Sequence, residues 1–473
     1  MKININKINK IYMIGIKGVG MTMLAQYFKE NGKEVSGSDV AEKFMTDEVL
    51  KKCDIKVFEK FSSQNIGNDL DLIIYSTAYN ANNNEELSFA LESKIPTIKY
   101  AEAMGEVFNQ KYGIAVVGSH GKTTTTAWLG YVMEKAGKSP SVMVGARVPQ
   151  FDGASLNGFS DFLVIEADEY QNKLQYFRPQ AVLLNNIDYD HPDYFRTEDD
   201  YLQVFIDFIQ KIPSKGFLVA NFDDKNIAKI ANVNCRGKVI SYAINESADY
   251  VAYDIRQDQD KQIFNVKLGS DFETDELINS DLGEFSVSLS GKHNIYNALA
   301  VIAACVEFGM NLVDVRTYLE DFLGTARRME IMGKFRGATI IDDYAHHPTE
   351  VKTTLAGIRE KYKKVKIITV FHPHTFTRTR ALLDDFAYSF DSTDELIVLD
   401  IYGSAREQQG GVSSLDLIKK IQERKNCAIK KISHIPNLEK VEEYLRENVE
   451  RDDLIVLMGA GDVFRIGERL IGK

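Results

Sequence analysis

The chain has 473 residues, too many for a single compact core, and this length predicts about three domains of ordinary size. Apolar residues make up 44% and charged residues 26%, which is globular usage and excludes a disordered or fibrous chain. The formal net charge of −11 is opposite in sign to that of proteins that bind nucleic-acid backbones, so nucleic acid is excluded as a main partner.

The cysteine pattern and the apolar runs bear on where the protein works. The four cysteines are far apart without a C-x-x-C pair, which argues against a disulfide framework or a cysteine-built zinc site and fits a reducing compartment. The N-terminal stretch lacks the apolar run of a signal peptide, and no window approaches about 18 consecutive apolar residues. We therefore expect a cytoplasmic protein with no stable membrane association, either a monomer or a homodimer.

In chain order, short β-branched runs alternate with longer amphipathic stretches, which is the pattern of parallel sheets with crossover helices. The first hundred residues contain three predicted strands, at 11–16, 34–39 and 71–78. A new strand at 112–119 follows a short helical stretch, so we place a domain boundary near residue 108.

The next segment repeats this pattern and then changes. Strands are predicted at 161–168, 181–188 and 216–221. Across 249–289 apolar and polar positions alternate, which is typical of solvated antiparallel strands. Helices are predicted at 293–309 and 312–323.

After Gly324 a third alternating series begins, with predicted strands at 338–343, 365–371, 395–400, 428–433 and 453–458. The sequence thus predicts an α/β protein of three domains, 1–108, 109–324 and 325–473, the middle one with an added antiparallel β part.

The strongest local motif lies between a strand and a helix. A glycine-rich turn there lets backbone N–H groups surround phosphate oxygens at a helix N-terminus. We expect Lys122 to neutralise the outer phosphates of ATP and the Thr123 hydroxyl to bind Mg²⁺. Val116 stands where the common form of this loop has its first glycine. The motif comprises Gly118, Ser119, His120, Gly121, Lys122, Thr123 and Thr124.

Acidic and amide groups follow the next two strands. Residues 166–169 read Glu-Ala-Asp-Glu, and residues 185–193 include His191 in a D-H-x-D cluster. Ligands bind at the carboxyl edge of parallel sheets, where acidic residues complete a magnesium shell of oxygen ligands. Taken alone, the cluster around His191 is as well explained by a solvated loop.

Basic and imidazole groups gather in later segments. Arg327 lies at the second boundary, from which it can reach a γ-phosphate across a cleft, and His293 with Asn294 opens a helix. Two further strands are followed by residues 342–347 and 372–380, both rich in histidine. Each group alone is explained by a surface pair or a helix cap, but together they suit the binding of a small zwitterion or phosphate.

The first glycine run, Gly15-Ile16-Lys17-Gly18-Val19-Gly20, departs from the G-x-G-x-x-G dinucleotide fingerprint because Lys17 occupies the middle position. Asp39 ends the second strand, where a ribose-binding acid is expected. The run predicts a nucleotide diphosphate at the first helix N-terminus; NAD binding and a purely structural turn remain open.

With these segments in this order, the chain resembles the Mur ligase family over nearly its whole length. The resemblance is carried by the first glycine run and by GSHGKTTTT, EADE, NNIDYDHPD, GKHNIYNALA, TARRMEIMG, DDYAHHPTEV, VFHPHTFTRTRAL and GAGD. It implies an N-terminal Rossmann-like domain for a uridine diphosphate sugar, a central P-loop ATPase domain, and a C-terminal Rossmann-like domain for an amino acid.

The resemblance also implies roles for individual residues. Beyond the phosphate loop, ATP would contact His293, Asn294, Arg327 and Asp342. The metal would be bound by Thr123, Glu166 and His191. The amino-acid side would comprise Tyr344, His346, His374 and Arg378. The UDP-sugar would face Gly18, Gly20, Ser38, Asp39, Ser76, Thr77 and His120. Catalysis would fall to Lys122, Arg327, His346 and His374, one imidazole taking the amine proton.

The chain departs from the family pattern at three positions. Lys17 and Met23 replace glycines of the first run, and Thr375 stands where an arginine is usual. Later family members carry a carbamylated lysine near positions 205–207, whereas here the nearest lysine is Lys211. This favours the alanine-adding members or the related tripeptide-adding ligases.

The implied reaction is ATP-dependent ligation of L-alanine to the lactyl carboxylate of UDP-N-acetylmuramate, in cytoplasmic peptidoglycan precursor synthesis. The carboxylate would attack the γ-phosphorus to form an acyl phosphate, and the alanine amine would then displace phosphate. An NAD(P)-dependent oxidoreductase and a non-catalytic ATP-gated binding module are the alternatives from other classes. The oxidoreductase leaves the Lys122 loop and the acidic strand end unexplained.

Overall fold

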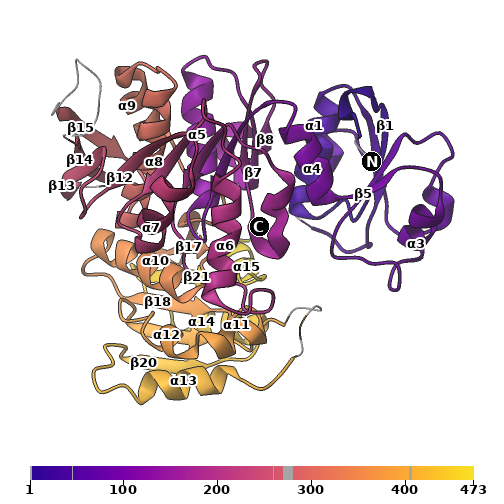
Figure 1. Cartoon of the computed structure of the whole chain (residues 1–473). Coiled ribbons are helices and arrows are strands. Elements are labelled where there is room, and N and C mark those ends of the chain that lie inside the picture. Colours follow the sequence, from indigo (N-terminus) through magenta and orange to yellow (C-terminus); the bar gives the residue numbers. More distant parts are fainter. Residues whose placement is uncertain are drawn as a thin grey trace.

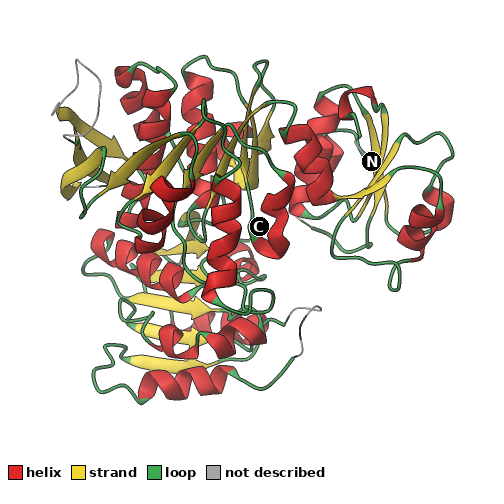
Figure 2. Ribbon diagram, viewed as in Figure 1, coloured by secondary structure: helices red, strands yellow, loops and turns green. Residues whose placement is uncertain are grey.

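The computed structural model describes residues 3–44, 46–258, 260–269, 281–403, 407 and 409–472. Three β-sheets follow one another along the chain, and helices cover each of them (Figure 1, Figure 2). The sheet formed by the N-terminal residues lies to one side of the large central sheet, and the C-terminal sheet lies below it (Figure 1). The α/β class predicted from the sequence is confirmed.

The N-terminal sheet is parallel throughout, in the order β3-β2-β1-β4-β5. Its three inner strands were predicted from the sequence, whereas the edge strands β3 and β5 are only three residues long. The strands are β1 (Lys10–Ile14), β2 (Glu34–Ser38), β3 (Lys56–Phe58), β4 (Leu72–Tyr75) and β5 (Thr97–Lys99). The α-helices are α1 (Val19–Glu30), α2 (Asp47–Lys52), α3 (Glu85–Glu92) and α4 (Tyr100–Phe108).

The central sheet has the order β15-β14-β13-β12-β11-β10-β6-β9-β7-β8. Its inner strands are parallel and nearly all apolar, as expected where helices cover both faces. The strands are β6 (Tyr112–Val117), β7 (Ser141–Val148), β8 (Gly153–Leu156), β9 (Phe162–Glu166), β10 (Ala181–Leu184), β11 (Phe217–Asn221), β12 (Lys238–Ala243), β13 (Tyr250–Asp258), β14 (Lys261–Leu268) and β15 (Asp281–Val287).

The two faces of the central sheet carry different helices. One face packs against α5 (Lys122–Lys135), α8 (Lys292–Glu307) and α9 (Leu312–Asp321), the other against α6 (Glu198–Ile209) and α7 (Lys225–Asn234). A 3-10 segment, η4 (Tyr170–Tyr176), follows β9. Strands β13, β14 and β15 form the antiparallel edge expected for 249–289, of which 270–280 lie outside the described residues.

The C-terminal sheet has the order β16-β17-β21-β18-β19-β20, with only the β16–β17 pair antiparallel. The strands are β16 (Glu330–Phe335), β17 (Ala338–Asp343), β18 (Ile367–Phe371), β19 (Glu395–Val398), β20 (Lys431–His434) and β21 (Leu454–Met458). The helices are α10 (Pro348–Lys361), α11 (Phe376–Ala381), α12 (Leu383–Ala387), α13 (Ser414–Gln422), α14 (Leu438–Asn448) and α15 (Phe464–Ile471).

The two seams between the three parts differ in chemistry. One apolar cluster continues from the N-terminal part into the central part, where Phe108 of α4 meets Phe177 with ring centroids 5.4 Å apart. The clusters around the C-terminal sheet draw their described members from residue 329 onward. The seam between the central and C-terminal parts is therefore closed mainly by polar contacts.

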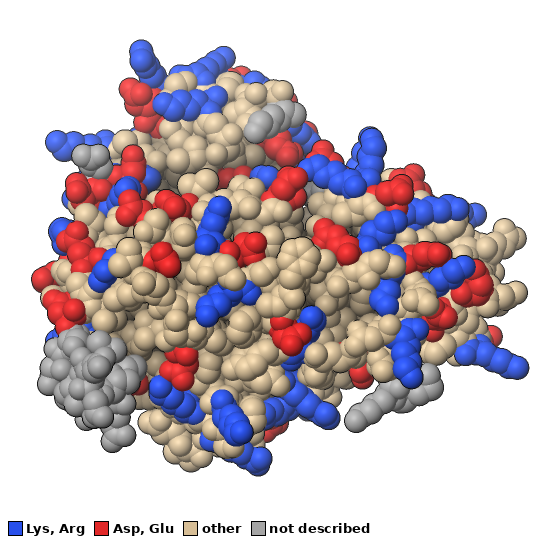
Figure 3. All heavy atoms as spheres, turned by 90° about the horizontal axis from the view of Figure 1, so that it is seen from above, with Lys and Arg blue, Asp and Glu red and all other residues tan. Residues whose placement is uncertain are grey.

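The surface carries charges of both signs. Seen from above, Lys and Arg side chains are interspersed with Asp and Glu side chains (Figure 3). In the part of the chain that the structure describes, no helix has the length and apolar character needed to cross a bilayer.

Candidate active site

The phosphate loop connects β6 to α5, as the sequence predicts. Gly118 and Gly121 have φ of +130° and +79°, and Gly121 caps the helix. A Cβ on Gly118 would lie 2.8 Å from the carbonyl oxygen of Asn186. Glycine is needed at both positions because a side chain would strain the backbone and strike the neighbouring segment.

The end of β10 supports this loop from beside it. The Asn186 side chain accepts from the His120 N–H at 2.7 Å, and the Ser119 hydroxyl donates to the Asp188 carbonyl at 2.6 Å. The sequence singled out residues 185–193 for their metal- and phosphate-suited groups. The structure shows that two of them also hold the shape of the phosphate loop.

Lys122 lies over its own loop. Its ammonium donates to the carbonyl oxygens of Gly118 and Ser119, the latter at 3.0 Å, and to Glu169 Oε2 at 3.2 Å. Burial would lower the pKa of Lys122, but the neighbouring carboxylates, Glu169 foremost, outweigh it and raise that pKa. The side chain is therefore a permanent cation, placed where a phosphate can replace the carbonyl oxygens.

Two groups of metal-suited side chains flank the loop. Thr123 Oγ1 donates to Glu166 Oε1 at 2.9 Å, and Glu166 Oε2 accepts from the Gly145 N–H at 2.8 Å. Asp168, Glu169 and His191 form the second group, whose ligand atoms lie within 4.8 Å of one another. This set of hydroxyl, carboxylate and imidazole donors fits a divalent cation bound beside a triphosphate.

Lys211, the nearest lysine to the position that later family members carbamylate, is held away from these carboxylates. Its ammonium donates to the carbonyl oxygens of Leu174 and Gln175, both at 3.0 Å. It thereby fastens the end of η4 to the end of α6.

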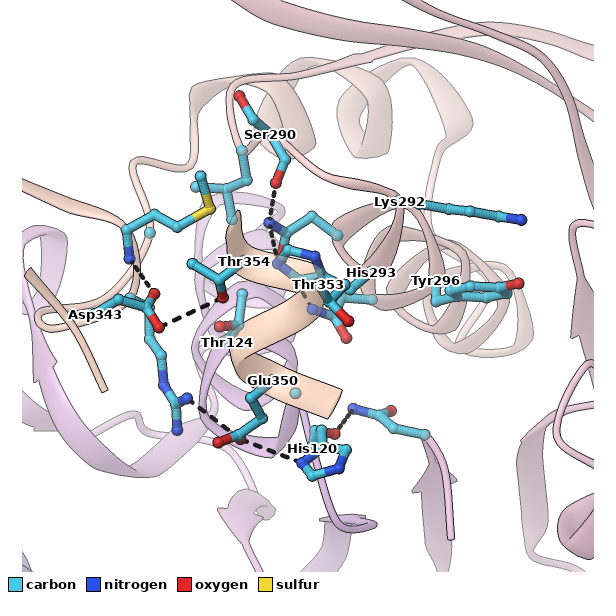
Figure 4. Close-up of a pocket in the computed structure, with 18 of the residues that line it drawn as sticks. His120, Thr124, Ser290, Lys292, His293, Tyr296, Asp343, Glu350, Thr353 and Thr354 are labelled. Atoms are coloured by element: carbon cyan, nitrogen blue, oxygen red, sulfur yellow. Dashed lines mark hydrogen bonds and ion pairs between the residues drawn. The ribbon is translucent and has the colours of Figure 1, made fainter. Parts of the chain in front are cut away.

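A cavity of about 510 Å³ lies between the central and C-terminal parts (Figure 4). Of the residues predicted to contact ATP, it is lined by His120, Gly121, Thr124, His293 and Asn294. From the other side it is lined by Arg328, Asp343, Thr349 and Glu350, which lie in the motifs at 325–333 and 342–351 but were given no individual role from the sequence. The phosphate loop and the start of α8 therefore face α10 and β17 across one space.

His120 links the two sides of this cavity. Its Nε2 lies 2.9 Å from Asp188 Oδ2. Its Nδ1 lies 3.2 Å from Glu350 Oε1 on the opposite side (Figure 4). Burial would lower the pKa of His120, but these two carboxylates raise it to about 9. Thr349 adds a hydrogen bond from its hydroxyl to Asp188 Oδ2 at 2.6 Å. His120 was expected to contact both ATP and the UDP-sugar; in the structure its ring lies between Asp188 of the central part and Glu350 of the C-terminal part.

Arg327 does not line the cavity, in contrast to the expectation for an ATP contact. Its Nε donates to Asp342 Oδ2 at 3.0 Å, and its guanidinium lies over the rings of Tyr344 and Phe464. Burial raises the pKa of Asp342 to about 7 despite this arginine. The neighbouring Arg328 lines the cavity instead, with Nη1 3.6 Å from Glu350 Oε1.

Asp342 and Asp343 are divided in the same way. Asp342 faces Arg327, whereas Asp343 lines the cavity and accepts from the Met329 N–H at 2.8 Å and the Ala345 N–H at 2.9 Å. Successive residues of a strand face opposite sides of the sheet. The two aspartates at the end of β17 therefore lie in two different environments.

The residues expected on the amino-acid side form a second group at the seam. The rings of His346 and His374 are 6.1 Å apart, and Tyr344 packs against His346 at 5.2 Å. Burial lowers the pKa of His346 to about 3, and burial with Arg378 lowers that of His374 to about 4. Both imidazoles are therefore neutral at pH 7.

Arg378 is bound to the central part. Its guanidinium donates to both carboxylate oxygens of Asp190, at 3.0 and 3.2 Å. Burial would raise the pKa of Asp190, but Arg378 holds it well below its usual range. The sequence did not predict this pair.

Apart from His120, the residues predicted to face the UDP-sugar lie around the carboxyl edge of the N-terminal sheet. Gly18 caps α1, and a Cβ on Gly20 would lie 2.7 Å from the Tyr100 hydroxyl oxygen. Ser38 donates to Glu86, and Ser76 accepts from the Ala78 N–H at 3.3 Å. Thr77 lines a second cavity, of about 500 Å³, between this sheet and η4.

Asp39 accepts three hydrogen bonds from the protein. It accepts from the Lys17 N–H at 2.7 Å, the Val40 N–H at 2.9 Å and the Tyr79 hydroxyl at 3.1 Å. The Lys17 ammonium turns away to Asp47, 3.2 Å from Oδ1. These contacts oppose the dinucleotide reading, in which Asp39 would bind ribose hydroxyls.

The fold and this site define a three-part α/β enzyme in which a phosphate loop with adjacent metal-suited carboxylates faces a further domain. Consecutive stretches match three family models: residues 10–112 the Mur ligase family catalytic domain, 116–305 the Mur ligase middle domain, and 327–461 the Mur ligase glutamate ligase domain. The chain belongs to the Mur ligase family.

Curated relatives match over the full length. The UDP-N-acetylmuramate–L-alanine ligase of Desulfitobacterium hafniense is 38% identical and is matched over 98% of this chain and 99% of the relative. That of Clostridium kluyveri is 39% identical over all of both chains. The solved UDP-N-acetylmuramate-alanine ligase of Thermotoga maritima has a TM-score of 0.80 at 24% identity, covering 98% of each chain, and shows the shared fold.

Proposed function

We propose that this enzyme joins L-alanine to the lactyl carboxylate of UDP-N-acetylmuramate at the expense of ATP, in peptidoglycan precursor synthesis. The observation that carries the proposal is the phosphate loop with Lys122 and Thr123, set beside carboxylates and opposite a basic, imidazole-rich seam. The curated relatives that match the whole chain bear this activity in their names. We infer the three domains to be 1–108, 109–324 and 325–473.

ATP binds in the cavity between the central and C-terminal domains. The N–H groups of the loop and Lys122 hold its β- and γ-phosphates, while His293 and Asn294 at the start of α8 contact the nucleoside end. Arg328, which lines the opposite wall, contacts the γ-phosphate, a role that we expected for Arg327 from the sequence. Mg²⁺, when bound by Thr123, Glu166 and His191, with Asp168 and Glu169 nearby, neutralises the phosphate charge.

The chain's own residues prepare a carboxylate for attack by an amine. A carboxylate resists amines because resonance and charge disfavour attack, so phosphorylation by ATP supplies the leaving group. Lys122 and Arg328 stabilise the negative charge of the transferring phosphoryl group. The UDP-sugar reaches this point from the α1 N-terminus, where Gly18, Gly20, Ser38, Ser76 and Thr77 line its path.

Tyr344, His346 and His374 surround the amino acid. The lowered pKa values keep both imidazoles neutral at pH 7, so each can accept a hydrogen bond from the attacking amine. Closure of the polar seam excludes water, which would otherwise hydrolyse the acyl phosphate.

The test is phosphate release by the purified chain with ATP, Mg²⁺, UDP-N-acetylmuramate and each of a panel of L-amino acids. Release that depends on alanine, with a product of the mass of the alanyl amide, is the expected result. The tripeptide L-Ala-γ-D-Glu-meso-diaminopimelate, offered in place of alanine, separates the related tripeptide ligases. Product from the tripeptide alone, or no nucleotide turnover with any acceptor, contradicts the proposal.

The variant Lys122→Ala tests the ATP site in the same assay. We expect it to abolish alanine-dependent phosphate release, because the outer phosphates lose the ammonium that lies over the loop, while circular dichroism stays that of the wild type. Near-normal turnover in this variant would count against the ATP site.

A further inference from the structure

A buried ion pair joins the C-terminal domain to the metal-binding loop of the central domain. The guanidinium of Arg378, in α11, donates through Nε and Nη2 to the two carboxylate oxygens of Asp190, which follows β10. The two side chains are only 6% and 8% exposed. A two-pronged pair of this kind fixes distance and angle together, so it forms only in one relative position of the two domains.

Asp190 in turn holds the residue that follows it. Its Oδ1 accepts from the backbone N–H of His191 at 2.7 Å, and His191 has φ of +58°. A non-glycine residue keeps this left-handed conformation only where its surroundings hold it. The Asp190 carboxylate, itself oriented by Arg378, is one such constraint.

A second constraint acts on the imidazole of His191. The ring of Tyr170 lies against it with centroids 4.5 Å apart, and the Tyr170 hydroxyl donates to Asp193 at 2.8 Å. His191 Nε2 lies 3.7 Å from Glu169 Oε1, within the group that also includes Asp168. The imidazole is therefore held between an aromatic ring and the carboxylates.

We propose that Arg378 is a positioning residue for the metal ligand His191, so that seating of the C-terminal domain completes the divalent-cation site of the central domain. This inference rests on the proposed function, which brings Mg²⁺ and ATP to that site. It gives Arg378 a part separate from any contact with the amino acid. The cation site and the acceptor side of the reaction are then assembled by one movement.

The test is Mn²⁺ binding to the full-length chain in the presence of a non-hydrolysable ATP analogue, with neither sugar nucleotide nor alanine. The electron paramagnetic resonance signal of free Mn²⁺ gives the dissociation constant. We expect Arg378→Ala to raise it about tenfold, although the changed residue lies in another domain, because partners of metal ligands have effects of this size. Arg378→Lys, which keeps the charge but has a single donor group, should lose less.

A double-mutant cycle tests whether the pair acts as one unit. Asp190→Ala should weaken Mn²⁺ binding at least as much as Arg378→Ala, and the double variant should be no worse than Asp190→Ala alone. Additive losses would show that Arg378 acts on the cation by another route, and would overturn the proposal.

Arg147→Ala is the matched control. Arg147 of β7 lies 3.6 Å from Glu330 of β16, a more exposed ion pair across the same seam that has no contact with His191 in the described structure. Its Mn²⁺ affinity should equal that of the wild type. If Arg147→Ala weakens binding as much as Arg378→Ala, domain docking in general is responsible and the specific pair is not.

Two outcomes distinguish this inference from a role of Arg378 in amino-acid binding alone and from the proposed function. Unchanged Mn²⁺ affinity in Arg378→Ala and Arg378→Lys, with a raised KM for alanine, would assign Arg378 to the amino acid alone and overturn the inference. A wild-type chain that forms no alanine-dependent product, while the Mn²⁺ series behaves as expected, would refute the proposed function and leave the coupling intact.

Discussion

At two places in the site, adjacent residues of the same type have different surroundings. Arg328 lines the cavity, whereas Arg327 is paired with Asp342 and lies between two aromatic rings. Asp343 likewise lines the cavity while Asp342 does not. In each of these two pairs the side chains have the same chemistry and differ in the direction in which they leave the backbone. Mutation is therefore informative at single-residue resolution.

We predict opposite effects for the two arginines. Arg328→Ala should lower kcat/KM for ATP by about 100-fold, because a cation aimed at the transferring phosphate is lost, with little change in stability. Arg327→Ala should lower the free energy of unfolding by about 3 kcal/mol, because Asp342 loses its buried partner. Phosphate-release kinetics and urea unfolding measure both. A stable Arg327→Ala with the larger kinetic defect would reverse the assignment.

A second residue-scale prediction concerns pH. The pKa of His120 in the folded protein, about 9, exceeds the ordinary histidine pKa of 6.5, so its contribution to stability is complete below pH 6.5 and is lost as pH rises through 9. His120→Gln should therefore be markedly less stable than the wild type at pH 6, and the difference should shrink by pH 10. Thermal unfolding across this range measures it. A constant difference would show that His120 is not charged in the seam.

At the scale of elements, the phosphate loop shows how local sequence dictates a site. A fully apolar strand, a turn with two glycines of positive φ and a helix follow directly on one another. The first-turn amide groups of α5 are thereby directed at the cavity. Asn186 and Lys122 hold the loop in this form through hydrogen bonds to its backbone groups.

We predict that Gly121→Ala disrupts this element. Its φ of +79° is unfavourable for alanine, and the new Cβ would lie 2.6 Å from Asn297 Oδ1. The variant should lose about 1–3 kcal/mol of stability and should bind the ATP analogue poorly. Calorimetric titration measures the binding. The exposed Gly137→Ala, also at positive φ but with open space around it, separates backbone strain from the clash.

The same scale shows what the sequence could predict. Most of the buried parallel strands and the phosphate loop have strong local signals and were located correctly, because apolar runs bounded by turns are clear when both faces are covered. Strands β7, β8 and β12 of the central sheet and the edge strands β3, β5 and β16 were missed, since short or mixed-pattern segments give only a weak local signal. The pairing of Asp190 with Arg378 joins residues 188 positions apart, which no local pattern reveals. The domain limits and the roles of individual site residues stay predictions.

At the scale of the whole molecule, the two seams between domains differ in the kind of contact that closes them. The N-terminal and central domains share one apolar cluster, whereas the C-terminal domain has its own clusters and meets the others through polar groups. Shared cores unfold together, and polar interfaces between domains permit movement. We therefore expect the first two domains to behave as one body and the third to move against it.

This arrangement predicts two unfolding transitions. The single tryptophan, Trp128, is fully buried in α5, so its fluorescence reports the central domain, whereas far-ultraviolet circular dichroism reports every helix. Urea titrations followed by the two signals should not coincide, because the C-terminal domain unfolds as a separate unit. Superimposable curves would show that all three domains unfold as one.

The polar character of the second seam has a thermal consequence. When this seam opens, ion pairs and hydrogen bonds such as those of Glu350 and Asp190 become exposed to water. Little additional apolar surface becomes exposed. Since exposure of apolar surface is what gives a process a large heat-capacity change, the enthalpy of this opening varies little between cold and warm conditions. The balance of open and closed enzyme is thus better tuned by ionic strength than by growth temperature.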